Sequence, residues 1–471
     1  MRTAIPRGAA LLPRRSVRAS LWSYAPLAVA LTLRLASSST ADLSYLLVAA
    51  YALLGPAHTI RALAMSWLFS MISPGLAPEA SAAAVGRYAV LFAAAASAML
   101  HSGFFFGRPH IRSYTLGTLL LGLSIVAHSL LFSPIADVSV LKAISWTLAM
   151  TALVSAWCGL SAQHREQVSR ELFWGLVILL LASLPLSASS LGYMRNGSGF
   201  QGILNHSQAF GPAMALLFAW ATSRLFGKAR PPWWLLGVSA ASLGAVMMSE
   251  ARTAGLAMVL AVGLAVLLGP GFGGRPMRQM LPGLRSARIW SMLGAVLVAG
   301  LVMAPTVGKM AQNYISKSGR AQVGGVQVDG LLEAYDHSRG GLIGAMVDNI
   351  LEHPLTGIGF GIASEPALMI VNRDSVLGLP VGASIEKGVT PLMVMEELGI
   401  FGALLVAFWI FRLLRSAARG SLASLAVCLT VLLLNMGEAT LFSPGGFGLL
   451  NLILLGWAYA SGAAAPGMRR A

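Results

Sequence analysis

The chain has 471 residues, of which 56% are hydrophobic and 11% are charged. A chain with so few charged residues has too little polar surface to be a water-soluble globule. Its apolar residues also fall in repeated blocks of about 20, the length that a bilayer core requires. The formal net charge of +16 would suit a nucleic-acid-binding protein. The basic residues, however, are spread over short loops and two tails, without a continuous basic face interleaved with aromatic residues, and this excludes nucleic acid as the partner.

The apolar blocks predict an all-α, polytopic integral membrane bundle, because they lack the polar alternation of barrel strands. The blocks 43–55 and 57–73 are open to two interpretations, either two short spans hinged at Pro56 or one long kinked span, which would reduce the count to thirteen. We expect about fourteen spans, near 21–37, 43–55, 57–73, 83–106, 115–133, 141–161, 171–189, 208–226, 233–249, 253–269, 289–308, 390–412, 418–437 and 444–463.

Clusters of arginine and lysine set the expected orientation, because such residues concentrate in cytoplasmic loops. With fourteen spans, all the basic clusters fall on the side of both termini, and the N-terminal span is expected to be an uncleaved anchor. The predicted organisation is a cytoplasmic basic tail at 1–20, a transmembrane bundle at 21–308, a long outer loop with short helices at 309–389, C-terminal transmembrane helices at 390–463 and a cytoplasmic tail at 464–471.

Several cations break this pattern, because they fall in segments expected on the outer face. A group of outward cations predicts an anionic partner. The residues concerned are Arg195, Arg252, Lys309, Lys317, Arg320, Arg339, Arg373 and Lys387.

The glycine-rich segment 195–208 opens directly into an apolar helix. Free backbone N–H groups at the start of a helix, with Arg195, Asn205 and His206 close by in sequence, could bind a phosphate. The alternative is an ordinary polar loop that ends in an Asn or Ser helix cap. The turn 249–253 leaves a similar choice, since Arg252 could contact substrate, pair with Glu250 or extend to the membrane interface.

Within the long loop, residues 338–353 have the apolar stripe of an amphipathic helix, which begins beside Arg339 and ends at Pro354. The glycines that follow allow a closely packed backbone, but no βαβ unit surrounds them, so they are not a nucleotide-binding motif. His337, Asp336 and Glu333 match no metal-ligand spacing, so we expect neither a metal site nor a cofactor.

The order of these features over residues 190–410 resembles the O-antigen ligase and O-antigen polymerase superfamily of bacterial envelope glycosyltransferases. The chain departs from the family at 384–388, where a Ser-Ile-Glu-Lys-Gly run replaces the usual His-Asn pair. The resemblance is carried by the glycine-rich segment before a helix, the Ser249-x-x-Arg252-Thr253 turn, Arg339 spaced from His353-Pro354-Leu355-Thr356-Gly357-Ile358-Gly359, and Glu397-Leu398-Gly399-Ile400-Phe401-Gly402.

The resemblance implies transfer of a glycan from an undecaprenyl diphosphate carrier to an acceptor hydroxyl at the periplasmic face of the bacterial inner membrane. Guanidinium groups can hold the oxygens of a diphosphate leaving group, and a carboxylate or imidazole must take the acceptor proton. We therefore expect Arg195, Arg252 and Arg339 to bind diphosphate with Lys387, Asn205 and His206, and Arg339 to act in catalysis with Glu386 or His337 as the base. Glu386 and Lys387 could instead be a solvated pair that caps the next span.

Three reactions occur within this superfamily, and the departure at 384–388 favours the first. A polymerase joins lipid-linked repeat units and would work with a partner that sets chain length; a ligase transfers the glycan to lipid A core; a third branch glycosylates proteins. A different class of function is a transporter or flippase for an anionic lipid, although we find no internal repeat between 21–230 and 231–463.

Overall fold

The computed structural model describes residues 21–80, 83–103, 109–193, 199–274, 276–302, 304, 341–373, 378, 380–383, 385 and 387–463. Helices occupy all fourteen positions at which apolar spans were predicted. They are α1 (Ala25–Ala36), α2 (Ser38–Ala52), α3 (Pro56–Met71), α4 (Ala83–Ser102), α5 (Pro109–Phe132), α6 (Ala136–Gly159), α7 (Ala162–Ser183), α8 (Ser207–Phe226), α9 (Trp233–Met248), α10 (Arg252–Gly273), α12 (Ala287–Val302), α16 (Thr390–Gly420), α17 (Leu422–Leu434) and α18 (Gly446–Ala463).

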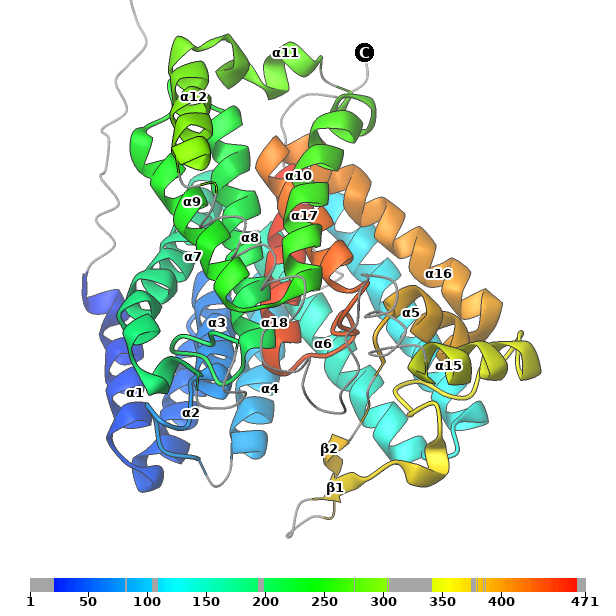
Figure 1. Ribbon diagram of the computed structural model, residues 1–471. Helices are drawn as coiled ribbons and strands as arrows, with labels where there is room; N and C mark the ends of the chain where they lie inside the picture. Colours follow the sequence, from blue (N-terminus) through cyan, green and yellow to red (C-terminus); the bar gives the residue numbers. More distant parts are fainter. Residues whose placement is uncertain are drawn as a thin grey trace, which may run out of the picture.

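The all-α membrane fold predicted from composition is confirmed (Figure 1). Within the described residues, eight helices are long and apolar enough to cross a membrane, and four shorter helices, α1, α9, α12 and α17, are also apolar. The core is formed around α6, α8 and α18. The indole side chains of Trp146 and Trp157 in α6 and of Trp220 in α8 are completely buried. Trp157 donates its indole N–H to the carbonyl of Ile453 at 3.0 Å, which ties α6 to α18 in the centre of the bundle.

Helices α2 and α3 are two antiparallel helices and not one long kinked helix. Gly55 adopts φ 137°, a conformation that favours glycine, and Pro56 is the first residue of α3. The rings of Tyr45 and Phe69 meet with centroids 5.6 Å apart, although they lie on opposite sides of this turn in sequence. The structure therefore supports the fourteen-helix interpretation.

The loops that were predicted to be cytoplasmic come together at one end of the bundle. Arg165 donates to the carbonyl of Ala460 at 3.0 Å, Ser416 donates to that of Tyr459 at 2.8 Å, and Arg412 bonds Ser113 at 2.8 Å. This end also carries α11 (Met277–Met280) and the 3₁₀ turn η5 (Pro282–Arg285) (Figure 1). We call it the basic end.

The outer segments meet at the opposite end. The Asn205 N–H donates to the carbonyl of Met71 at 2.7 Å, and the Phe200 N–H donates to that of Met248 at 2.9 Å. The segment between α12 and α16 contributes α15 (Gly341–Glu352), where the amphipathic helix was predicted, and an antiparallel hairpin that the sequence did not predict. The remaining short elements of this end are η3 (Leu184–Ala188), η4 (Ser190–Tyr193), η7 (Pro366–Leu368), β1 (Val371–Arg373) and β2 (Pro380–Ala383).

Candidate functional site

The 353–359 motif of the long loop and the 397–402 motif of the following span interlock into one unit, in which residues 354–361 wrap around the start of α16. Ile358 donates its N–H to the carbonyl of Glu396 at 2.8 Å, and Ile400 donates to that of Pro354 at 3.0 Å. Gly399 interrupts α16 with φ 63°, and a Cβ placed there would lie 2.1 Å from the carbonyl oxygen of Leu355. Only glycine fits this crossing, so the glycines of both motifs are required for packing.

A buried cluster of three charges, Lys387 with Glu396 and Glu397, lies inside this unit. The ammonium of Lys387 is 2.7 Å from Glu396 Oε2 and 3.1 Å from Glu397 Oε1, and the three side chains are at most 1% exposed. Asn349 of α15 donates to Glu396 Oε1 at 2.8 Å, and the Gly361 N–H donates to Glu397 Oε2 at 2.7 Å. The cluster therefore joins α15, the 354–361 loop, α16 and the residues that follow β2.

Lys387 was predicted to bind phosphate, and this geometry argues against that role. Its ammonium is held by two carboxylates, and an added phosphate would have to compete with both of them away from water. The alternative of a solvated pair that caps the next span does not describe Lys387 either, because its side chain is buried. The arrangement is that of a structural ion cluster.

The start of α8 is capped by the imidazole of His206, where an asparagine or serine cap had been the alternative to a phosphate site. His206 Nδ1 accepts the backbone N–H of Gln208 at 2.9 Å, and so satisfies one of the unpaired N–H groups of the first turn. The backbone of Asn205 is held by Met71. The hydrogen bond to His206 removes one of the donors on which the predicted phosphate site depended.

Arg252 is the first residue of α10, and its buried Nε atom forms no hydrogen bond. The next residue, Thr253, packs against Gly437, where an added Cβ would lie 2.2 Å from the threonine hydroxyl. The turn before α10 therefore contacts the turn between α17 and α18. This contact brings Arg252 to the outer end, although it is not among the residues that line the cavity described next.

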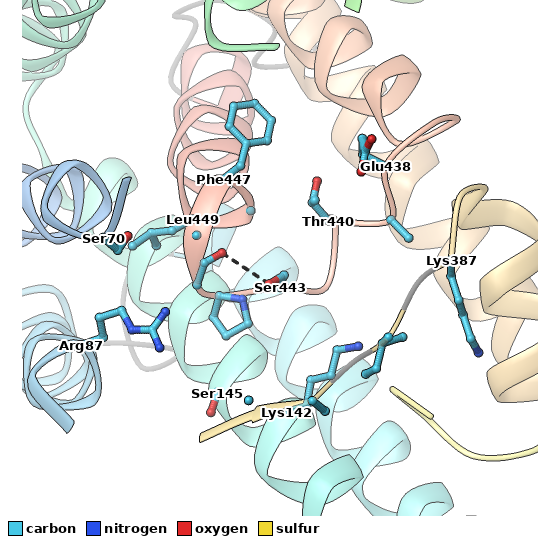
Figure 2. A pocket seen from close by; sticks show the side chains of 18 of the residues that line it. Ser70, Arg87, Lys142, Ser145, Lys387, Glu438, Thr440, Ser443, Phe447 and Leu449 are labelled. Atoms are coloured by element: carbon cyan, nitrogen blue, oxygen red, sulfur yellow. Dashed lines mark hydrogen bonds between the residues drawn. The ribbon is translucent and has the colours of Figure 1, made fainter. Parts of the chain in front are cut away.

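A cavity of about 800 Å³ opens at this outer end. Its walls come from α3, α4, α6, the first turn of α8, the 380–388 segment, α16 and residues 437–449. Figure 2 shows Arg87 of α4 reaching into the cavity from one side, Lys142 of α6 along its wall, and Glu438 with Thr440 on another side. The volume is in the range of small-molecule sites. The charged residues that line it are three cations, Arg87, Lys142 and Lys387, and one carboxylate, Glu438.

Arg87 and Lys142 were missed in the sequence. Each is a lone cation within or beside a predicted apolar span, close to the end expected on the outer face. That position is a functional signal by itself, because an ionisable residue inside a membrane segment is costly without a partner or a water-filled space. The motifs that were recognised by their spacing lie elsewhere in the chain and include neither residue.

Four of the predicted site residues, Arg195, Arg339, His337 and Glu386, lie outside the described residues. Their predicted roles stay predictions. Within the described part of the chain, no group of three or more histidine, cysteine, aspartate or glutamate side chains is placed to hold a metal ion.

No known protein-family model matches the chain, and no curated protein matches it in sequence.

Proposed function

We propose that this chain is a bacterial inner-membrane glycosyltransferase that moves a glycan from undecaprenyl diphosphate to an acceptor hydroxyl at the periplasmic face, as a polysaccharide polymerase. The observation that carries the proposal is the cavity of about 800 Å³ at the end of the bundle opposite the basic loops. The resemblance of residues 190–410 to the O-antigen ligase and polymerase superfamily supports it. The positive-inside rule supports the assignment of the cavity to the periplasmic face.

The cavity suits a lipid-linked substrate because of how it is built. Its walls combine the apolar side chains of membrane helices, such as Leu63, Leu91 and Val138, with the charged side chains of Arg87 and Lys142. A polyprenyl diphosphate has the same division, an apolar chain that favours lipid and an anionic head that favours cations.

The proposed reaction breaks the bond between the anomeric carbon and the diphosphate oxygen, and forms a bond from that carbon to the acceptor oxygen. The electron pair of the broken bond leaves with the carrier diphosphate, and the acceptor proton passes to a base on the protein. Cations near the leaving group stabilise the negative charge that develops on it.

Glu438 is the carboxylate that the described residues place in the cavity wall, and we propose it as a candidate base beside Glu386 and His337. It stands in the turn 437–440, whose Ala439 N–H donates to the carbonyl of Lys387 at 3.3 Å. The turn is therefore attached to the backbone of Lys387, and this attachment, which does not depend on the charges of the ion cluster, would hold the carboxylate in place for proton transfer.

The test is transfer from purified polyprenyl diphosphate-linked repeat units in detergent by the full chain, without a gradient. We expect elongated lipid-linked product from the parent and a loss of about 100-fold or more in Glu438→Gln if that carboxylate is the base. Glu365→Gln is the matched control, since Glu365 is an exposed acid of the same region outside the cavity wall.

The other outcomes separate the competing functions. If transfer requires added lipid A core, the chain is a ligase and not a polymerase. If it requires a protein acceptor, the chain is a protein glycosylase. A parent that never transfers glycan in detergent, but moves an anionic lipid across vesicles, would overturn the proposal in favour of a transporter.

A further inference from the structure

We infer that the outer cavity contains a binding site for a phosphate or diphosphate group, formed by Arg87 and Lys142. The inference deepens the proposed function and rests on it for the source of the anion, a lipid headgroup. Neither residue belongs to the motifs from which the sequence predicted diphosphate binding.

Arg87 supplies the first of the two charges. Within the described part of the chain its guanidinium forms no hydrogen bond and no ion pair, although its side chain is only partly exposed. Gly445 lies beside it, with an added Cβ 3.3 Å from Arg87 Nη1, so the group is close to the backbone of the turn before α18. A cation in this position at a membrane end is costly unless water or an anion compensates its charge.

Lys142 supplies the second charge from a different helix. Its ammonium lies 5.3 Å from the centre of the Phe360 ring, and no carboxylate among the described residues is within ion-pair distance of it. The contact with Phe360 holds the side chain against the loop that contains the glycine motif. Arg87 and Lys142 therefore face one cavity from two helices, α4 and α6, that pack against each other through Ala95, Ala98 and Ala152.

Three of the cavity hydroxyls already donate to backbone carbonyls. Ser70 donates to the carbonyl of Trp67 at 2.8 Å, Ser145 to that of Leu141 at 2.6 Å, and Ser443 to that of Gly445 at 3.3 Å. The guanidinium of Arg87 and the ammonium of Lys142 are charged donors, and charged donors bind an anion more strongly than the neutral hydroxyls and amide of the other lining residues do. Donors of this kind select an anion with several oxygens, and a diphosphate can accept from both.

The start of α18 also favours an anionic ligand in the cavity. Phe447, Gly448 and Leu449, in the first turn of this 18-residue helix, line the cavity. The positive end of the helix dipole therefore faces the space that the two cations share, and this favours a negative ligand there. Glu438 has the opposite charge but lies on another side of the cavity from Arg87 (Figure 2).

The inference is tested by measuring the affinity of the purified full chain in detergent for three probes: inorganic pyrophosphate, a short prenyl diphosphate and the corresponding neutral prenyl alcohol. We expect the Kd for the prenyl diphosphate to rise about tenfold or more in Arg87→Gln and in Lys142→Met, as loss of a charge-assisted hydrogen bond implies. Binding of the alcohol should not change.

Arg415→Gln is the matched control. It removes one positive charge from an exposed side chain of α16 near the basic end, and should leave all three affinities unchanged. Arg87→Lys is a second variant that keeps the charge but loses the planar fork, and an intermediate Kd is expected for it. Thermal unfolding without ligand shows whether each variant is folded.

Prenyl diphosphate bound more tightly than pyrophosphate would support a lipid headgroup as ligand, and equal affinities would support the anion site but overturn its lipid source. Unchanged diphosphate affinity in folded Arg87→Gln and Lys142→Met would overturn the site itself. A parent that binds prenyl diphosphate through these residues but transfers no glycan would contradict the proposed function alone.

Discussion

Two groups of cations at the outer end of the bundle differ in how their charge is balanced. All three cations, Lys387, Arg87 and Lys142, are among the residues that line the outer cavity. The ammonium of Lys387, however, is fully buried between Glu396 and Glu397. Arg87 and Lys142 form no ion pair with a carboxylate among the described residues. The first group already has its counter-charges inside the protein, so it can stabilise the fold but has little capacity left for a ligand. For the second group we propose an external anion as the counter-charge. The two groups thus differ in their partners.

The largest effect is expected from removing Lys387 alone. Lys387→Met leaves two adjacent carboxylates buried without a cation, and the loss of one partner from a buried ion cluster costs about 3–5 kcal/mol. We expect a lower midpoint of thermal unfolding in detergent and a small yield of folded protein.

Replacing all three charges sharpens this prediction. The variant Lys387→Met/Glu396→Gln/Glu397→Gln keeps side-chain oxygens for Asn349 and Gly361 and leaves no uncompensated charge, so most of the lost stability should return. A triple variant as unstable as Lys387→Met would contradict the account of the cluster as a charge-balanced unit.

A smaller loss of stability is expected from a substitution at Gly399, where the 354–361 loop crosses α16. Gly399→Ala places a Cβ 2.1 Å from the Leu355 carbonyl oxygen at a residue with φ 63°, and strain of this kind costs about 1–3 kcal/mol. The thermal midpoint should fall and the 354–361 loop should become more susceptible to protease.

Gly237→Ala is the matched control for this substitution. Gly237 lies in α9, and an added Cβ there meets nothing within 4 Å. Its stability should be unchanged or slightly higher, because alanine favours a helix by about 1 kcal/mol over glycine. Equal destabilisation by both substitutions would argue against a specific crossing at Gly399.

The smallest effect is expected from an exposed ion pair at the same end. Arg373 of β1 lies 2.6 Å from Asp137 of α6, but both side chains are more than 40% exposed. Arg373→Gln should lower stability by about 1 kcal/mol at most, and salt should weaken the pair in the parent. If Arg373→Gln lowered stability as much as Lys387→Met does, the difference in solvent exposure would not explain how much each ion pair contributes to stability.

The sequence predicted the helices well because a bilayer imposes the length and composition of each span locally. It also identified the segments that meet at the outer end, since the glycines at 357–361 and 399 and the turn at 249–253 are unusual in their own context. The ion-pair and hydrogen-bond partners of the charged residues could not be predicted in the same way. Lys387 and Glu396 are close in sequence, but the role of Lys387 depends on Asn349, Gly361 and the burial of all of them, which only the fold brings about.

Arg87 and Lys142 were missed for the same physical reason. Each is a single cation in an apolar context, and its significance lies in a cavity whose walls come from helices and turns spread over nearly 400 residues of sequence. The residue spacing within a motif reflects local packing requirements, such as the close backbone contact at Gly399. It does not indicate which side chains from distant parts of the sequence line a cavity near the motif.

Glycan transfer from polyprenyl diphosphate-linked repeat units by two multiple variants, each shown to be folded, distinguishes the two groups of cations most directly. The variants are Arg87→Gln/Lys142→Met and Lys387→Met/Glu396→Gln/Glu397→Gln. We expect the first to lose about 100-fold or more in kcat/KM, as the loss of two charge-assisted contacts implies, and the second to keep most of the parent activity. Parent-like transfer by the first variant with loss in the second would contradict this expectation, and would return the binding role to Lys387.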